Sequence, residues 1–240
     1  MKIILWKGKR KDKSLYIYSR FYSKEKVISI GSDCHSAYIL NAMNIRKESF
    51  IFDWLYTDSR LGIQYVTENI KNSFEFFLQN LVKNERGHVI SKNFPMTEFF
   101  HEQNLIDSEA DRRKMRKRAV RFLNAIKKEN ISFLYVINPE HFSDLEDINS
   151  FISSINELNR LTGYRHKLKI FIKCHVYITD FSIIDMLISS CESITNVKIV
   201  KYFIDTKKYG QWGNSKDYFL LLKSLGIKIH RSLLPNIYLD

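Results

Sequence analysis

VISIGSDCHSAYILNAM, residues 27–43, contains the change from a buried strand to a helix that decides the predicted fold. VISIG is a short apolar run that ends at Gly31, and the apolar residues among 37–42 have the spacing of a helix that begins near Asp33. A strand, a sharp turn and a helix in this order form the unit from which α/β sheets are built. The stretch therefore predicts the first strand and the first helix of an α/β domain.

Four more apolar runs have the length and composition of buried strands: ISFLYVINP (131–139), LKIFIKCHV (168–176), VKIVKYFI (197–204) and IKIHRSLL (227–234). Stretches with helical period separate these runs, at 145–161, 181–194 and 215–226. Asp144 stands before the first of these helices as an N-cap. This alternation predicts a Rossmann-like three-layer sandwich, with a mostly parallel sheet of about five strands and helices on both faces.

Two segments lie outside the alternating pattern. Residues 1–26, with KIILW and SLYIYSRFY on either side of GKRKDK, predict an N-terminal arm or hairpin, and residues 27–240 form a single α/β domain. Residues 45–110 are dense in aromatic side chains and predict an insertion of helices and loops after the first strand and helix. Ligands of α/β proteins bind beyond the carboxyl ends of the strands, so we expect this insertion to wall a site.

The composition is that of one globular domain in a reducing compartment. The chain has 240 residues, 45% of them hydrophobic and 14% aromatic, which is enough for a sizeable core. Its three Cys lack the spacing of a disulfide framework, and no run reaches the about 18 apolar residues of a membrane span. The N-terminal apolar run is too short for a signal peptide. We therefore expect a cytoplasmic protein.

The net charge of +12 favours an anionic partner, which the charge alone does not identify. Much of the excess lies in RRKMRKRAVRFLNAIKK, residues 112–128, where apolar residues recur at helical spacing. We interpret this segment as an amphipathic helix with a solvated basic face. Peripheral contact with a membrane stays open, but no nucleic-acid motif accompanies the helix, so we do not expect nucleic-acid binding.

Cys34 is the candidate nucleophile, because a thiol in the first turn of a helix faces unpaired N–H groups and the positive end of the helix dipole. Both features stabilise a thiolate, and the same N–H groups can hold an oxyanion. The alternative is a small buried residue, which is how we interpret Cys174 and Cys191 in their apolar surroundings. No Cys or His has the spacing of a metal site, so we expect no metal.

A cysteine nucleophile needs a base and a group that orients the base. Among seven His, His101 in the aromatic insertion is the first choice, and His230 on the last predicted strand is the second. His35 adjoins Cys34 but should point away from it. Asp53 between aromatic residues is the candidate orienting carboxylate; the alternative is a helix cap.

Residues 27–55 resemble the opening block of a bacterial family of papain-like cysteine peptidases, an uncharacterised domain often met in surface-polysaccharide gene clusters. That block reads LGxxCxxAxxL and then R-x-x-S-x-PFDW. It is matched here by Gly31, Cys34, Ala37, Leu40, Arg46, Ser49, Phe52, Asp53 and Trp54, with Ile51 in place of the proline. Later blocks are similar to NSFEFFL (72–78), to the surroundings of His101 and to KMRKRAVRF (114–122).

The resemblance implies a Cys/His acyl-transfer site with Cys34, His101 and Asp53 as its catalytic residues. It also gives Arg118 and Arg121 a role in binding an anionic substrate group, and Arg118 is placed to reach Asp53. We expect the remaining substrate contacts from Gly31, Ser32, Asp33 and Trp54. The papain fold pairs a helical lobe with an antiparallel barrel, whereas this chain alternates strand and helix, so we expect the chemistry of that family without its fold.

Three functions stay open. The first is hydrolysis of a peptide, ester or thioester, without a required cofactor. The second is transfer of an acyl or other group to a glycan from an anionic donor such as coenzyme A. The third is a non-catalytic module that binds an anionic ligand through the basic helix. The substrate class (small molecule, glycan or peptide) and the oligomeric state also stay open.

Overall fold

The computed structural model describes residues 2–6, 13–18, 20–233 and 236–239, and a parallel sheet organises this described part. The sheet has four strands in the order β11–β10–β9–β4. They are β4 (Lys26–Ser29), β9 (Ile131–Ile137), β10 (Lys167–His175) and β11 (Val197–Ile204). The first four predicted strands are confirmed, and β9 is buried at every position, as expected for a strand covered on both faces.

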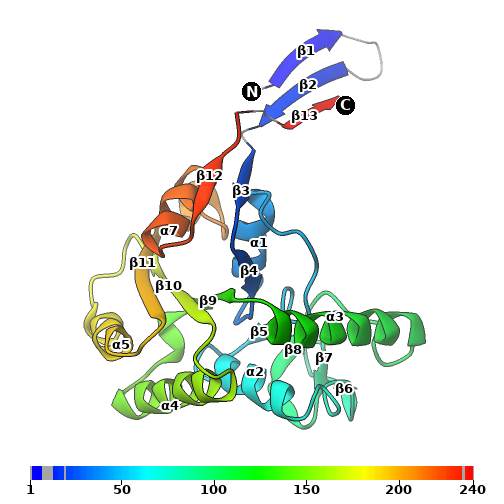
Figure 1. The fold of residues 1–240 in the computed structure, drawn as a ribbon, viewed down its shortest axis with the longest axis vertical. Helices are drawn as coiled ribbons and strands as arrows, with labels where there is room; N and C mark the ends of the chain where they lie inside the picture. Colours follow the sequence, from blue (N-terminus) through cyan, green and yellow to red (C-terminus); the bar gives the residue numbers. More distant parts are fainter. Residues whose placement is uncertain (1, 7–12, 19, 234–235, 240) are drawn as a thin grey trace.

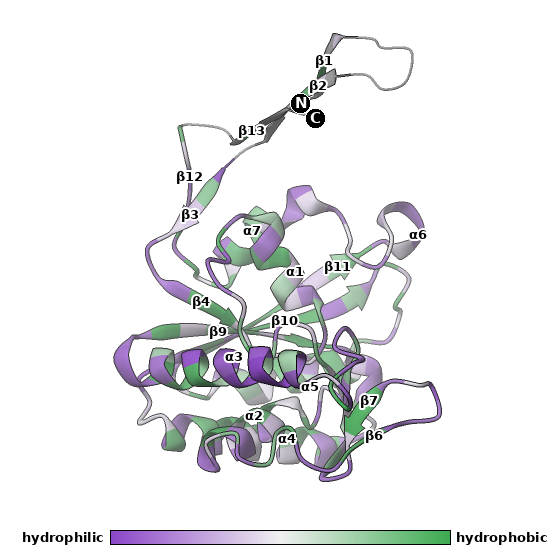
Figure 2. Ribbon diagram, turned by 90° about the vertical axis from the view of Figure 1, so that its right-hand side faces the viewer, coloured by the Kyte–Doolittle hydropathy of each residue, from purple (hydrophilic) through white to green (hydrophobic). Residues whose placement is uncertain are grey.

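Helices cover both faces of the parallel sheet (Figure 2). On one face pack α3 (Glu109–Lys128), α4 (Leu145–Leu161) and α5 (Ser182–Glu192), whose apolar side chains share a core cluster with Ile28 and Phe133. On the other pack α1 (His35–Ala42) and α7 (Tyr218–Ser224). The helix predicted over 145–161 is confirmed, and the Asp144 carboxylate caps it by accepting hydrogen bonds from the next turn.

The fifth predicted strand does not join the parallel sheet. β12 (Ile229–Arg231) pairs antiparallel with β3 (Phe21–Ser23), which precedes β4. Residues 227–230 alternate between buried and exposed, which suits a strand with one solvated face and not a strand covered on both. The strand order also follows the chain without the reversal of a Rossmann fold. The fold is therefore mixed α/β. The α/β class and a parallel sheet with helices on both faces are confirmed. The parallel sheet has four strands in place of about five, and antiparallel sheets accompany it, so the expectation of a single Rossmann-like sandwich is not met.

The insertion after α1 contains strands that the sequence pattern did not predict. It holds α2 (Gly62–Lys71), which packs against α4, and a four-stranded antiparallel sheet in the order β5–β8–β7–β6. Its strands are β5 (Tyr56–Thr57), β6 (Leu81–Lys83), β7 (Val89–Ser91) and β8 (Phe94–Phe99). The expectation of helices and loops was thus incomplete, because three of the four strands have only two or three residues and are too short to show a period.

Strands from near both ends of the chain form a fourth sheet. β1 (Lys2–Trp6) and β2 (Lys13–Tyr18) pair antiparallel, and β13 (Asn236–Leu239) adds to β2. Figure 1 shows this sheet extending away from the rest of the molecule. The GKRKDK turn expected between the first two strands lies outside the described residues except for Lys13, as does Leu234 of the last predicted strand. Short helices complete the described chain: η1 (Pro139–His141), α6 (Thr206–Tyr209) and η2 (Ser215–Asp217).

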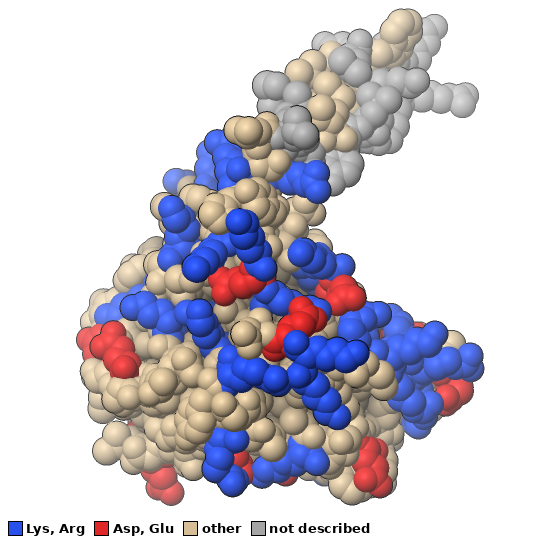
Figure 3. Space-filling model, viewed as in Figure 1, with Lys and Arg blue, Asp and Glu red and all other residues tan. Residues whose placement is uncertain are grey.

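The basic segment forms the amphipathic helix α3, as predicted. Met115, Ala119, Phe122 and Ile126 are buried against the sheet. Lys and Arg side chains cover the outward side of this helix, seen at the right of Figure 3. Several of them form ion pairs with acidic neighbours, for example Arg116 with Glu109.

Candidate functional site

The turn between β4 and α1 is held by buried hydrogen bonds to the neighbouring strand and to the insertion. Gly31 has a φ of +100°, a conformation that favours glycine. The Ser32 hydroxyl donates to the carbonyl oxygen of Val136 at 2.8 Å and lies 2.9 Å from the Ser59 hydroxyl. The Ser32 carbonyl accepts from the amide of Thr57. Ser32 is fully buried, so its polar groups position the turn and do not face solvent.

Asp33 connects the start of α1 to the end of β10. One carboxylate oxygen accepts a hydrogen bond from the His35 amide at 2.7 Å. The other accepts from Lys173 Nζ at 2.8 Å, an ion pair in which both side chains are mostly buried. Lys173 was not singled out in the sequence, although its position in the mainly apolar run LKIFIKCHV, which also contains Lys169, was the available signal.

Cys34 occupies the N-cap position of α1 and is partly exposed. Burial, and to a smaller extent the Asp33 carboxylate, raise the pKa of its thiol to about 11. The backbone amide of Cys34 and the Lys173 ammonium lower the pKa, but by less. In the resting protein, desolvation of the charged form thus outweighs the stabilisation that the backbone N–H group and Lys173 give the thiolate.

Alkylation of Cys34 by iodoacetamide should follow this pKa. We expect its rate to rise about tenfold per pH unit through neutral pH and to level off near pH 11, because only the thiolate reacts. Asp33→Asn should speed alkylation at pH 8, since it removes a negative neighbour, and Lys173→Met should slow it. Rates are measured by mass spectrometry of the peptide that carries Cys34. A midpoint near pH 8.5, or the same direction of change in both variants, would contradict the assigned environment.

Two histidines considered from the sequence lie away from the thiol. His35 is buried on the side of α1 that faces α7, where its Nε2 donates to the Trp212 carbonyl at 3.0 Å. Burial lowers the pKa of His35 to about 4, so the ring is neutral. The prediction that His35 points away from Cys34 is confirmed. His230 lies on β12, where its ring stacks on Tyr22 ahead of β4, whereas Cys34 follows the other end of that strand.

Asp53 is 1% exposed and forms an ion pair with Arg46. One of its oxygens accepts from Arg46 Nη2 at 2.7 Å, from Arg46 Nε at 3.0 Å and from the Phe50 amide at 2.8 Å. Burial raises the pKa of Asp53, although Arg46 opposes the rise. Asp53 is close enough to raise the pKa of Cys34, but its bonds hold the loop that contains it and do not orient a histidine.

The side chains of Trp54 and His101 contact each other next to Asp53. The Trp54 ring contacts the Arg46 guanidinium, 5.2 Å from its centroid, and the His101 ring, whose centroid is 5.5 Å away. His101 is exposed in the turn after β8. Within the described ranges no hydrogen bond joins the Cys34 sulfur to an imidazole, so the structure brings His101 to the Asp53–Trp54 segment but not into contact with the thiol.

Arg118 and Arg121 connect α3 to the loop of Asp53 and to the turn of His101. Arg118 Nη1 donates to Glu102 Oε1 at 2.8 Å, and its positive charge lowers the pKa of Asp53 without contacting it. Arg121 Nη1 donates to the Ser49 carbonyl at 2.6 Å. Both guanidinium groups therefore have protein partners, and they hold the loop of Asp53 and the turn of His101 in place.

His141 follows the carboxyl end of β9, and the sequence analysis did not single it out. His141, after β9, accepts at Nδ1 from the Ser59 amide at 2.9 Å, and its Nε2 is 3.4 Å from the Tyr56 hydroxyl. Burial raises the pKa of Tyr56, and the Asp33 carboxylate contributes to the rise. The signal available in the sequence was the position of His141 shortly after the buried strand β9.

The part of the chain that the structure describes contains no group of three or more His, Cys, Asp or Glu arranged to hold a metal ion. In the same residues no helix is both long enough and apolar enough to cross a membrane.

Residues 25–173 of the 240 match the profile of a family described as "Putative papain-like cysteine peptidase (DUF1796)". An uncharacterized protein of Acanthamoeba polyphaga mimivirus is 40% identical over 52 residues, which are 22% of this chain and 23% of that protein. The chain thus matches less than a quarter of this relative's length. No solved structure matches the chain. The matched family region runs from the start of β4 to Lys173 and contains Cys34, Asp53 and His101.

Proposed function

Because the chain belongs to the family of papain-like cysteine peptidases, we propose that it is a cysteine hydrolase whose nucleophile is Cys34. The observation that carries this proposal is the place of the thiol, which is partly exposed at a strand-to-helix turn among ionisable groups. The charges of Asp33, Lys173 and Asp53 all act on the thiol, and the His101 ring contacts Trp54, the residue after Asp53. The family supports the hydrolase type of chemistry, whereas the parallel sheet differs from the papain architecture.

The raised pKa of Cys34 requires a base during the reaction. With a pKa of about 11, roughly one thiol in ten thousand is ionised at pH 7. His101 is proposed for this role because its ring is exposed and has no hydrogen bond to another described residue, so its nitrogens are available. A swing of the ring from Trp54 toward Cys34, on substrate binding, would bring base and thiol together.

The proposed reaction has two steps. The Cys34 sulfur attacks the substrate carbonyl while His101 takes the thiol proton, and the same proton passes to the leaving group as the acyl bond breaks. Water then attacks the thioester, His101 takes a proton from the water, and the thiol is regenerated with release of a carboxylic acid. The positive end of α1 and the first-turn amides are placed to stabilise the oxyanion of each step.

Trapping of the acyl enzyme tests this function. With p-nitrophenyl acetate at neutral pH, we expect an acetyl adduct on Cys34 in the intact protein, located by mass spectrometry of its peptides. His101→Ala should slow adduct formation about a hundredfold or more without changing the thermal midpoint, since general-base catalysis contributes on this scale. His141→Ala is the matched comparison. An adduct on a lysine alone, or equal rates in wild type and His101→Ala, would refute the nucleophile or the base respectively.

A further inference from the structure

The sheet of β1, β2 and β13, which we name the terminal sheet, stands apart from the rest of the described protein (Figure 1 and Figure 2). Neither core cluster of the described residues includes a residue of these three strands. The antiparallel pair β3–β12 connects the terminal sheet to the body, since β2 leads into β3 and β12 leads into β13. A three-stranded sheet depends for its stability on covering an apolar face, so we expect this sheet to contact a partner.

One face of the terminal sheet carries exposed apolar side chains. Ile3, Trp6 and Ile237 are paired with positions 15, 13 and 17 of β2, respectively. Alternate residues of a strand lie on one face of a sheet, and directly opposed residues share a face. The three side chains therefore lie on the same face, where their exposed fractions are 37%, 67% and 60%. This face is open to a partner.

Exposed basic side chains gather where the terminal sheet leaves the body, as Figure 3 shows. They lie on the β3–β12 pair or next to it, and we name them the basic collar: Arg20, Lys24, Lys228 and Arg231. Glu25 is the acidic residue of this region, and its carboxylate accepts hydrogen bonds from the Ser132 hydroxyl and from a backbone amide. The collar thus has a net positive charge.

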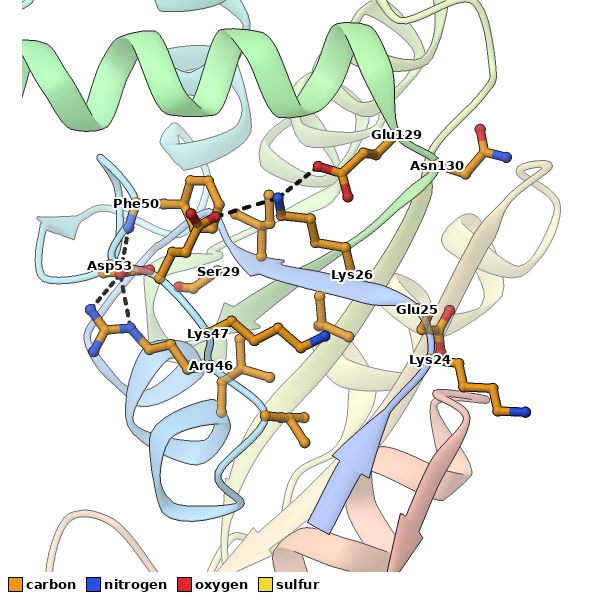
Figure 4. A pocket seen from close by; sticks show the side chains of 15 residues that line it. Lys24, Glu25, Lys26, Ser29, Arg46, Lys47, Phe50, Asp53, Glu129 and Asn130 are labelled. Carbon is orange, nitrogen blue, oxygen red and sulfur yellow. Dashed lines mark hydrogen bonds and ion pairs between the residues drawn. The ribbon is translucent and has the colours of Figure 1, made fainter.

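The charges beside β4 behave differently from the collar. A pocket of about 480 Å³ lies along this strand (Figure 4), and its charged side chains are largely paired. Lys26 pairs with Glu129 at 2.7 Å, and Arg46 pairs with Asp53 at 2.7 Å. Lys24 also lines the pocket, but in Figure 4 its side chain extends away from these ion pairs, and among the residues described it has no ion-pair partner. Positive charge is therefore neutralised at the pocket but not at Lys24.

The sequence places most of the excess charge in the same part of the chain. Residues 1–26 contain nine Lys or Arg and two Asp or Glu, which is +7 of the net charge of +12. A second copy of the chain carries the same positive charge, so repulsion opposes the pairing of two terminal sheets. Nucleic acid would attract the basic residues but leave the aliphatic side chains uncovered. A membrane that contains anionic lipids fits both features, because it offers hydrocarbon and negative charge on one surface.

We propose that the terminal sheet docks on an anionic membrane surface, with Ile3, Trp6 and Ile237 in the lipid interface and the basic collar on the headgroups. Tryptophan is the side chain that most favours the level of the headgroups, and the isoleucines reach the boundary of the acyl chains. The collar adds attraction to negatively charged lipids. This docking is peripheral and does not depend on Cys34, so it stands apart from the proposed hydrolase function.

Vesicle flotation of the full chain measures the docking. Vesicles of phosphatidylcholine with about a quarter phosphatidylserine should bind the chain at least about tenfold more tightly than vesicles of phosphatidylcholine alone. The difference should shrink in about 0.5 M salt, because salt screens exposed charges. Tryptophan emission should shift to shorter wavelength on binding. Trp6→Phe should still bind but lose this shift, since Trp54 and Trp212 belong to the body.

Ile237→Glu tests the apolar face and should weaken binding to anionic vesicles about tenfold or more, because it places a negative charge in the interface. Leu145→Glu is the matched control. Leu145 is 55% exposed at the start of α4, which lies at the opposite end of the molecule in Figure 1, so this variant should bind like the wild type. Both variants should keep the thermal midpoint of the wild type, since both side chains are exposed.

The double variant Arg20→Gln/Lys24→Gln tests the basic collar and should weaken binding to anionic vesicles about tenfold, with little effect on neutral ones. Lys83→Gln/Lys92→Gln, at exposed lysines of the insertion, is the control and should leave binding unchanged. Absence of binding up to about 1 mM lipid, equal binding to neutral and anionic vesicles, or equal effects of Ile237→Glu and Leu145→Glu would overturn the proposal. A dimer in sedimentation velocity that Ile237→Glu dissociates would also overturn it, by assigning the apolar face to a second copy.

Discussion

Cys34→Ala should lower hydrolysis of p-nitrophenyl acetate by at least about a thousandfold in kcat/KM, because it removes the atom that forms the covalent intermediate. The loss should not come from unfolding. Cys34 is partly exposed and its side chain caps no amide of α1, so we expect the free energy of unfolding to change by less than about 1 kcal/mol. Steady-state kinetics and urea denaturation of the same preparations measure both quantities.

Cys191→Ala is the matched control for this prediction. Cys191 is fully buried in α5, and burial raises the pKa of its thiol to about 12. The variant should lose some stability through the small cavity it creates and keep its activity. If Cys34→Ala keeps more than about a tenth of the wild-type rate, Cys34 is not the nucleophile.

Arg46→Ala should be the most destabilising single change in the neighbourhood of the site, by about 3–5 kcal/mol at pH 7. The variant leaves the Asp53 carboxylate buried without its cation, and the desolvation of that charge is then uncompensated. The control is Arg116→Ala, which breaks an exposed ion pair with Glu109 and should cost less than about 1 kcal/mol. Both free energies come from urea denaturation.

The destabilisation should depend on pH in a defined direction. Burial already raises the pKa of Asp53 in the folded protein, and Arg46 lowers it, so removal of Arg46 raises this pKa further. A carboxyl group with a raised pKa binds a proton more tightly in the folded than in the unfolded chain. Stability of the variant should therefore increase, relative to the wild type, as pH falls from 7 toward about 4. A difference that is constant over this range would mean that Asp53 is not the cause.

Arg46, Ser49 and Asp53, which belong to the motif that resembles the family, have a structural role in their loop. Arg46 donates to the Ser49 hydroxyl as well as to Asp53, and Arg121 donates to the Ser49 carbonyl. These bonds hold the loop of residues 46–54 between α1 and α3. The residues of the R-x-x-S-x-x-x-D spacing thus hold the loop that contains Trp54. The sequence analysis had instead expected Trp54 to contact substrate and Asp53 to orient the base.

The sequence by itself determined the elements that depend on neighbouring residues. The apolar runs of β9 and β10, the helical period of α4 and its Asp144 cap, and the strand-to-helix turn at Cys34 follow from backbone geometry over a few residues. The tertiary structure alone decided the rest. The ion pair of Asp33 with Lys173 joins residues 140 positions apart, and β12 pairs with β3, which lies near the other end of the chain. The sequence singled out Cys34 as the candidate nucleophile, but the raised pKa of its thiol could not be predicted, because desolvation depends on the atoms that the whole fold places around it.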